Sequence, residues 1–239
     1  MSEANWTPLG WGEDKLSEFL QRVTDHQFTT FTNVRTAFDK LREVDDCFLH
    51  IVENTEEPQS SRLCLVLFKR CHCTYRAACG TSMAGQHPET FVILRSCLEY
   101  SGYALLIHQN PNLDTVWLRR HAGADAGQTM RNEFTARKAK RAVESTDPGV
   151  GNWYSNLYED TIDFGGHPNP KGIVPITRCD EDTYGQIDLH SDDLFLRHCL
   201  DVTLRVGLCS LHVFHNIFPE RFNIELRKNI DELRLTKHL

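Results

Sequence analysis

The stretch TFVILRSCLEYSGYALLIHQ, Thr90 to Gln109, decides the fold class of this chain. Its apolar residues surround the axis of a helix on nearly all sides, which is typical of a helix covered from several directions. Asn110-Pro111-Asn112 ends the pattern, and Pro88 suits the first helical turn. The stretch therefore predicts a central helix that other helices enclose.

Helical spacing of apolar residues dominates the remaining sequence as well. It predicts further helices over residues 13–25, 32–52, 62–84, 113–121, 124–144, 152–164, 192–218 and 222–235. Residues 172–190 are strand-like, but Pro175 argues against a central strand, so a hairpin or an irregular flap is expected. The predicted fold class is all-α: a multi-helix bundle with a short hairpin-like excursion near 172–190.

The composition is that of an ordinary globular protein, with 40% hydrophobic and 25% charged residues in a chain of 239. We expect one helical domain over residues 1–239, with an N-terminal helical extension over 1–55 and a bundle core over 62–239. No stretch approaches the roughly 20 apolar residues of a membrane span, and the N-terminus lacks the build of a signal peptide. A cytoplasmic location without membrane contact is the expectation.

Net charge and cysteine usage limit which partners and cofactors are expected. The net charge of −7 argues against non-specific binding to nucleic acid. The basic run RNEFTARKAKR, Arg131–Arg141, is interpreted as a solvated helix face, with phosphate or nucleic-acid contact as the alternative. Nine cysteines without a secretory signal predict reduced thiols. Cys71 and Cys73 would point to different sides of a helix, so neither a metal nor a cofactor is expected.

Two charges interrupt the central helix. Arg95 and Glu99 are the only acidic or basic residues between Thr90 and Ile107, and their spacing of four places them on one face. Burying such charges costs several kcal/mol, on the usual order of magnitude, unless partners satisfy them. One interpretation is a structural ion pair that ties helices together. The other is a polar site in the bundle, where ionisable groups carry out chemistry.

A polar stripe also runs along the last long predicted helix. His198, Asp201 and Arg205 follow one another at steps of three and four among apolar neighbours. The stripe either faces solvent or meets the face of Arg95 and Glu99. Asp201 and Arg205, which lie midway along the helix, are the better candidates for the interior.

The loop FGGHPNPKGI, Phe164–Ile173, is unusually specified for a linker. Gly165 and Gly166 can adopt left-handed dihedrals that let the chain leave the preceding helix sharply. His167 and Asn169 each precede a proline, which restricts them to extended backbone. Such a loop either makes a plain tight turn or presents an imidazole and a carboxamide for binding or catalysis.

These polar residues are predicted to form one site. We expect Arg95, Glu99 and His167 to converge as catalytic residues. Five further residues are candidates for binding: Asp160, Asp163, Asn169, Asp201 and Arg205. A carboxylate hydrogen-bonded to His167 would fix its tautomer and suit it to proton transfer near neutral pH.

The order of motifs resembles that of an uncharacterised bacterial all-helical family. The motifs are Arg95-x3-Glu99, the stop Asn110-Pro111, the W-x-x-R helix at Trp117–Arg120, and an aromatic helix from Trp153 that ends near His167. Proteins of this kind have been suspected of distant kinship with HEPN-type helical ribonucleases and abortive-infection proteins. HEPN nucleases carry R-x4–6-H in one segment, a spacing at which Arg95 has no histidine, so His167 would have to supply it.

Two classes of function remain open, because the chain carries no P-loop, G-x-S-x-G, H-E-x-x-H or dinucleotide fingerprint. One is a hydrolase or metal-independent ribonuclease that uses His167 as acid or base beside Arg95 and Glu99. The other is a non-catalytic helical module that binds a partner protein or a small ligand. The partner and the oligomeric state, including a homo-oligomer, are left open by the sequence.

Overall fold

A computed structural model describes residues 7–53, 62–166, 168–180, 183–191 and 194–235. Within these residues the protein has eleven α-helices and one two-stranded antiparallel sheet. The all-α fold class and the short hairpin excursion are therefore confirmed.

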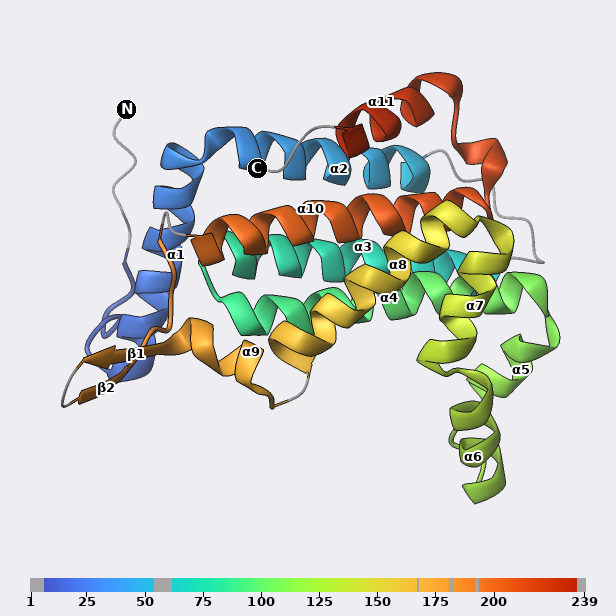
Figure 1. Ribbon diagram of the computed structural model, residues 1–239, viewed down its shortest axis with the longest axis horizontal. Helices are drawn as coiled ribbons and strands as arrows, with labels where there is room; N and C mark the ends of the chain where they lie inside the picture. The colour runs from blue at the N-terminus through green and yellow to red at the C-terminus, as the bar shows by residue number, and fades with distance from the viewer. Residues whose placement is uncertain (1–6, 54–61, 167, 181–182, 192–193, 236–239) are drawn as a thin grey trace.

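The elements follow one another along the chain as drawn in Figure 1. They are α1 (Lys15–Asn33), α2 (Arg35–Glu53), α3 (Arg62–Met83), α4 (His87–Gln109), α5 (Asn112–Leu118), α6 (Ala124–Glu133), α7 (Ala136–Thr146), α8 (Pro148–Thr161), α9 (Pro170–Ile173), β1 (Thr177–Asp180), β2 (Thr183–Gln186), α10 (Leu194–His215) and α11 (Ile224–Leu235). Three short turns of other helical types are η2 (Ile162–Gly166), η3 (Val174–Ile176) and η4 (Pro219–Arg221).

The helix α4 is the centre of the bundle, as its sequence predicts. It contacts α3, α10, α7, α8 and η2, and its buried side chains include Phe91, Leu94 and Leu98. By length and composition alone α4 could cross a membrane, but 61% of its most apolar window is buried inside the protein. That degree of burial is what a core helix of a globular protein shows.

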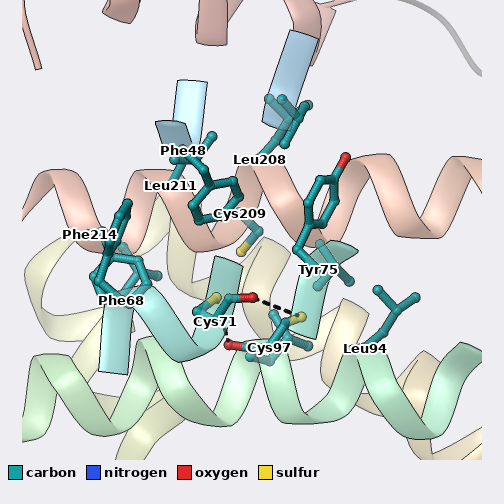
Figure 2. Packing of buried hydrophobic residues seen from close by; sticks show 14 of the residues in the cluster. Phe48, Phe68, Cys71, Tyr75, Leu94, Cys97, Leu208, Cys209, Leu211 and Phe214 are labelled. Carbon is teal, nitrogen blue, oxygen red and sulfur yellow. Dashed lines mark hydrogen bonds between the residues drawn. The ribbon is translucent and has the colours of Figure 1, made fainter. Parts of the chain in front are cut away.

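The core lies where α2, α3, α4 and α10 meet (Figure 2). The ring of Phe48 lies 5.5 Å from that of Phe68, and the ring of Phe68 packs edge-on against Phe214 at 4.8 Å. The thiols of Cys71 and Cys97 each donate to the backbone carbonyl of the other residue, at 3.5 and 3.8 Å. These contacts join α3 to α4 without a disulfide.

The two N-terminal helices differ in how they contribute to the core. In α2, Phe48 and Ile51 are fully buried within the main hydrophobic cluster. In α1 only Ser17 and Thr30 are buried, and Phe28 remains 67% exposed. Thus α2 is part of the core, whereas α1 lies against it through few side chains. The predicted division near residue 55 stays a prediction.

The predicted polar helix over 124–144 is wrong in one respect, because the chain forms two helices there. Phe134 is buried and adopts a non-helical backbone after α6. The side chain of Thr135 then accepts a hydrogen bond from the Lys138 amide and begins α7. A buried aromatic followed by an N-cap threonine outweighs the continuous polar pattern.

The glycine loop also departs from its prediction. Gly165 does not adopt a left-handed backbone, because the helix α8 continues into the π-helical turn η2. A Cβ atom on Gly165 would lie 2.4 Å from the carbonyl oxygen of Pro88. Gly165 is therefore required by the close approach of η2 to the first turn of α4, rather than by the turn itself.

The hairpin excursion returns the chain to the start of α4. Strands β1 and β2 pair in register from Thr177 with Gln186 to Asp180 with Thr183. Beyond them, the amide of His190 donates to the carbonyl oxygen of Gly85 at 2.9 Å. Gly85 has φ +76°, and a Cβ there would lie 2.0 Å from the His190 carbonyl oxygen. This contact fixes the segment that leads into α10.

Candidate functional site

Arg95 and Glu99 form an ion pair that a tyrosine from a distant helix completes. Arg95 Nε donates to Glu99 Oε1 at 3.0 Å, and the hydroxyl of Tyr158 donates to the same oxygen at 2.9 Å. The Arg95 guanidinium lies 5.3 Å from the centre of the Tyr158 ring. The Arg95 and Glu99 side chains are 29% and 30% exposed, so the pair opens to solvent rather than lying inside the core.

Further side chains from three helices surround this pair. Lys140 of α7 lies over the Tyr158 ring at 4.6 Å and pairs with Glu159. Burial and the Glu99 carboxylate raise the pKa of Tyr103 to about 12, whereas Arg95 and Arg120 act to lower it. Burial and Glu99 also raise the pKa of Tyr158, which therefore stays a hydrogen-bond donor at neutral pH. We call Arg95, Glu99, Tyr158 and Lys140 the α4–α8 site.

The helices α5 to α7 beside this site are basic. Between residues 112 and 146 there are seven arginines and lysines against four acidic residues, although the whole chain has a net charge of −7. Five exposed arginines of this segment form no ion pair with any carboxylate that the structure describes: Arg119, Arg120, Arg131, Arg137 and Arg141. Arg137 and Arg141 lie four residues apart and share one face of α7. We call α5–α7 the basic lobe; it lies at one end of the molecule (Figure 1).

A second polar group forms between α8 and α10. Arg205 Nη1 lies 3.6 Å from Asp201 Oδ2, and the Asp201 residue is only 8% exposed. Asp160 of α8 lies near enough to Arg205 and His198 for their positive charges to act to lower its pKa. Burial outweighs these cations and raises the pKa of Asp160. Burial likewise lowers the pKa of His198, although Asp160 and Asp201 oppose the shift.

Aromatic rings and a second histidine enclose His198. His198 Nδ1 lies 3.2 Å from Nε2 of the buried His87, at the first turn of α4. The His198 ring packs edge-on against Phe164 at 4.8 Å and tilted against Phe91 at 5.4 Å. A neutral imidazole beside a carboxyl group can exchange protons. Here the rings cover much of the imidazole, so a stabilising role is the simpler interpretation.

Two residues of α8 face different neighbours. Tyr158 points to α4, whereas Asp160, two residues further along, faces α10. Residues two apart on a helix project in different directions. The structure thus pairs Arg95 with Glu99 and Arg205 with Asp201, and it places Asp160 near Arg205. The convergence of these residues into one site stays a prediction.

The other predicted residues lie in and after η2. Asp163 pairs with Lys171 of α9. The Asn169 side chain caps α9 by accepting from the amides of Lys171 and Gly172, at 2.9 and 3.2 Å, and it donates to the carbonyl of Ile162. The Asn169 carboxamide therefore stabilises the start of α9 and its contact with η2. His167 lies outside the described residues, so its predicted approach to Glu99 stays a prediction.

The cysteines and other candidate metal ligands form no metal site in the described residues. Cys71 is buried against α4 and Cys73 is exposed, so the two thiols of the CHC motif point apart as predicted. In the described ranges, no group of three or more histidine, cysteine, aspartate or glutamate side chains could hold a metal ion.

Comparison with known proteins gives no family. No protein-family model, curated protein or solved structure matches this chain. The resemblance to a bacterial helical family with HEPN-like features stays a prediction, and the function is argued from the geometry alone.

Sequence reasoning missed Tyr158 and Lys140 as members of the site. Tyr158 is one of several aromatic residues at helical spacing, which usually indicates core, and it is indeed 98% buried. Only its hydroxyl reaches Glu99, 59 residues away in sequence. Lys140 belongs to the basic run, and its proximity to Tyr158 depends on how α7 packs against α8.

Acidification is expected to destabilise the fold through three partly buried histidines. Partial burial is the main reason why the pKa values of His198, His212 and His215 lie below the ordinary 6.5. The unfolded chain then binds more protons near pH 6, so this contribution to stability is complete above about pH 7.5 and falls as the pH drops through 6.5. Urea unfolding at pH 7.5 and 5.5 should show the loss.

Substitution of His198 separates its share of this effect. The His198→Asn variant should lose less stability between pH 7.5 and 5.5 than the unmodified protein, because one partly buried titratable group is gone. His121→Asn, which removes an exposed imidazole, serves as the control. An identical pH dependence in the unmodified protein and His198→Asn would show that His198 does not contribute.

Proposed function

We propose that the chain is a ribonuclease-type hydrolase that binds RNA along the basic lobe and cleaves it at the α4–α8 site. The observation that carries the proposal is the set of five exposed arginines that have no carboxylate partner in the described part of the chain, in a protein of net charge −7. Unpaired arginines concentrated on one lobe favour a polyanion, since each phosphate contact releases counterions. The lobe adjoins Arg95 and Glu99, where the reaction would take place.

The chemistry follows from the donors and acceptors of that site. Glu99 Oε1 accepts from Arg95 and Tyr158, whereas Oε2 accepts no hydrogen bond from a described residue. Oε2 can therefore take the proton of a ribose 2′-hydroxyl, whose oxygen attacks the adjacent phosphorus. Arg95 uses Nε for Glu99 and is 29% exposed, so its terminal nitrogens can reach a phosphate oxygen.

The 5′-oxygen that leaves the phosphorus must receive a proton from an acid. In the proposed reaction, the 5′-oxygen leaves with a proton from His167, and the product keeps a 2′,3′-cyclic phosphate. No redox partner is consumed, and the nucleophile comes from the RNA itself. Single-stranded DNA, which lacks the 2′-hydroxyl, should therefore be bound but not cleaved.

Binding is the first test of the proposal. Fluorescence anisotropy with a labelled single-stranded RNA should show weaker binding by the Arg137→Gln/Arg141→Gln double variant. The slope of log K against log salt should also fall by about one for each phosphate contact removed. The control is Arg35→Gln/Arg42→Gln on α2, where both arginines are paired with aspartates. Equal losses in both double variants would contradict a specific role for the basic lobe.

Cleavage in excess EDTA is the second test. Cleavage that persists in EDTA and gives a cyclic phosphate end supports the proposed chemistry. RNA that is bound and never cut would instead favour the alternative class, a non-catalytic helical module.

A further inference from the structure

A separate cleft lies between α1, α2 and α3, away from both polar groups. Its volume is about 500 Å³, and its wall is apolar. Phe28 and Phe31 of α1, Phe38 and Leu41 of α2, and Met83 of α3 form most of this wall. Clefts of about 300–1,000 Å³ with apolar walls and a few polar groups are typical of small-molecule sites.

Charged side chains at the cleft leave cationic donors unused. Arg76 engages Asp45 through Nε at 2.7 Å and Nη2 at 2.9 Å, and His72 Nε2 lies 2.7 Å from the same carboxylate. Burial acts to raise the pKa of Asp45, but the hydrogen bonds from Arg76 and His72 outweigh it and hold the pKa below its usual range. The Asp45 carboxylate is thus already saturated and does not need a cationic ligand.

The two arginines retain free nitrogens. Arg76 Nη1 has no hydrogen-bond acceptor among the described residues. Arg42 donates through Nη1 to Asp46 at 3.3 Å, and its Nε lies 3.9 Å from Asp39, so Nη2 is the nitrogen with no described acceptor. Both side chains are 52% exposed, and both residues line the cleft. An acceptor that carries negative charge fits these donors best.

We propose that this cleft binds a small amphiphilic carboxylic acid, with its apolar body among the phenylalanines and its carboxylate at Arg42 and Arg76. The apolar body would cover Phe28 and Phe31, which are 67% and 37% exposed. Burial of apolar area is the main source of affinity for such a body, at roughly 25 cal/mol per Å². The arginines would add selectivity for an acid over an alcohol of the same length.

Displacement of a fluorescent probe tests this proposal. The probe is 1-anilinonaphthalene-8-sulfonate, an apolar anion that fluoresces in apolar sites, and the competitors are dodecanoate and dodecanol below their aggregation limits. We expect dodecanoate to displace the probe at roughly tenfold lower concentration than dodecanol, the effect of one charge-assisted hydrogen bond. Arg42→Gln should abolish this preference and leave displacement by dodecanol unchanged.

Two further variants assign the effect to the cleft. Arg70→Gln removes an exposed arginine of α3 that does not line the cleft, and it should keep the preference for dodecanoate. Gly80→Leu should reduce binding of the probe and of both competitors, because a Cβ at Gly80 points toward Gln27 of α1 and a larger side chain would fill the cleft. Circular dichroism confirms that each variant is folded.

Three results would overturn the proposal. The first is equal displacement by acid and alcohol in the unmodified protein. The second is a preference for the acid that survives Arg42→Gln. The third is probe binding that disappears as the protein self-associates at higher concentration, which would make the cleft an interface between copies of the chain.

Discussion

Replacing Glu99 with glutamine is expected to lower the rate of RNA cleavage by about 10²–10⁴-fold, the usual contribution of a general base. The carbonyl oxygen of glutamine can still accept from Arg95 Nε and from the Tyr158 hydroxyl, so the local structure should persist. What the variant loses is the carboxylate oxygen that would take the 2′-hydroxyl proton. Single-turnover cleavage of a labelled RNA measures the loss.

A matched control makes this result interpretable. Glu133→Gln breaks another partly exposed ion pair, with Lys138 at 2.7 Å, on the neighbouring basic lobe. Its cleavage rate should stay within twofold of the unmodified protein, on the order of surface substitutions in general. If Glu99→Gln mainly lowers thermal stability and His167→Ala leaves cleavage unchanged, Arg95 and Glu99 are a structural pair and the proposed function is wrong.

Replacing Phe48 with alanine should lower the free energy of unfolding by about 3–5 kcal/mol, the range for a large buried aromatic. Phe48 is fully buried, stacks on His72 at 5.1 Å and contacts Tyr75 at 5.5 Å. The loss is a large fraction of the roughly 5–15 kcal/mol that stabilises a typical domain. Equilibrium unfolding in urea provides the measurement.

The same substitution on α1 is the comparison. Phe28 is 67% exposed, so Phe28→Ala should cost less than about 0.5–1 kcal/mol. Equal losses in the two variants would mean that α1 contributes to the cooperative core as much as α2 does, contrary to their burial.

The central position of α4 could be predicted because its apolar residues surround the helix axis on nearly all sides, and such a helix must be covered from several directions. The pairing of Arg95 with Glu99 could be predicted because their spacing is local. In contrast, the hydrogen bond from Tyr158 depends on how α8 crosses α4, which no local pattern encodes. The same crossing places Asp160 near Arg205 and His198 of α10.

The glycine loop shows another limit of sequence patterns. Gly165 was expected to permit a left-handed backbone, yet its role is to leave room for the carbonyl oxygen of Pro88. A glycine pattern alone does not distinguish a conformational requirement from a close approach of two elements. Likewise, the break between α6 and α7 depends on the burial of Phe134, which is a tertiary property.

The shallow attachment of α1 has a consequence for the hierarchy of motions in the molecule. Only two residues of α1 are buried, and its described polar contacts with the rest of the protein are at the surface: the hydrogen bond from Gln27 to the Gly80 carbonyl and the ion pair of Arg22 with Asp188. We therefore expect α1 to detach without disturbing the core. The amide hydrogens of α1 should therefore exchange with solvent through local opening. Those of α4 and α10 should exchange only when the whole protein unfolds. Detachment of α1 would also remove the wall of the cleft that Phe28 and Phe31 form. A ligand could then enter the cleft at little cost in free energy.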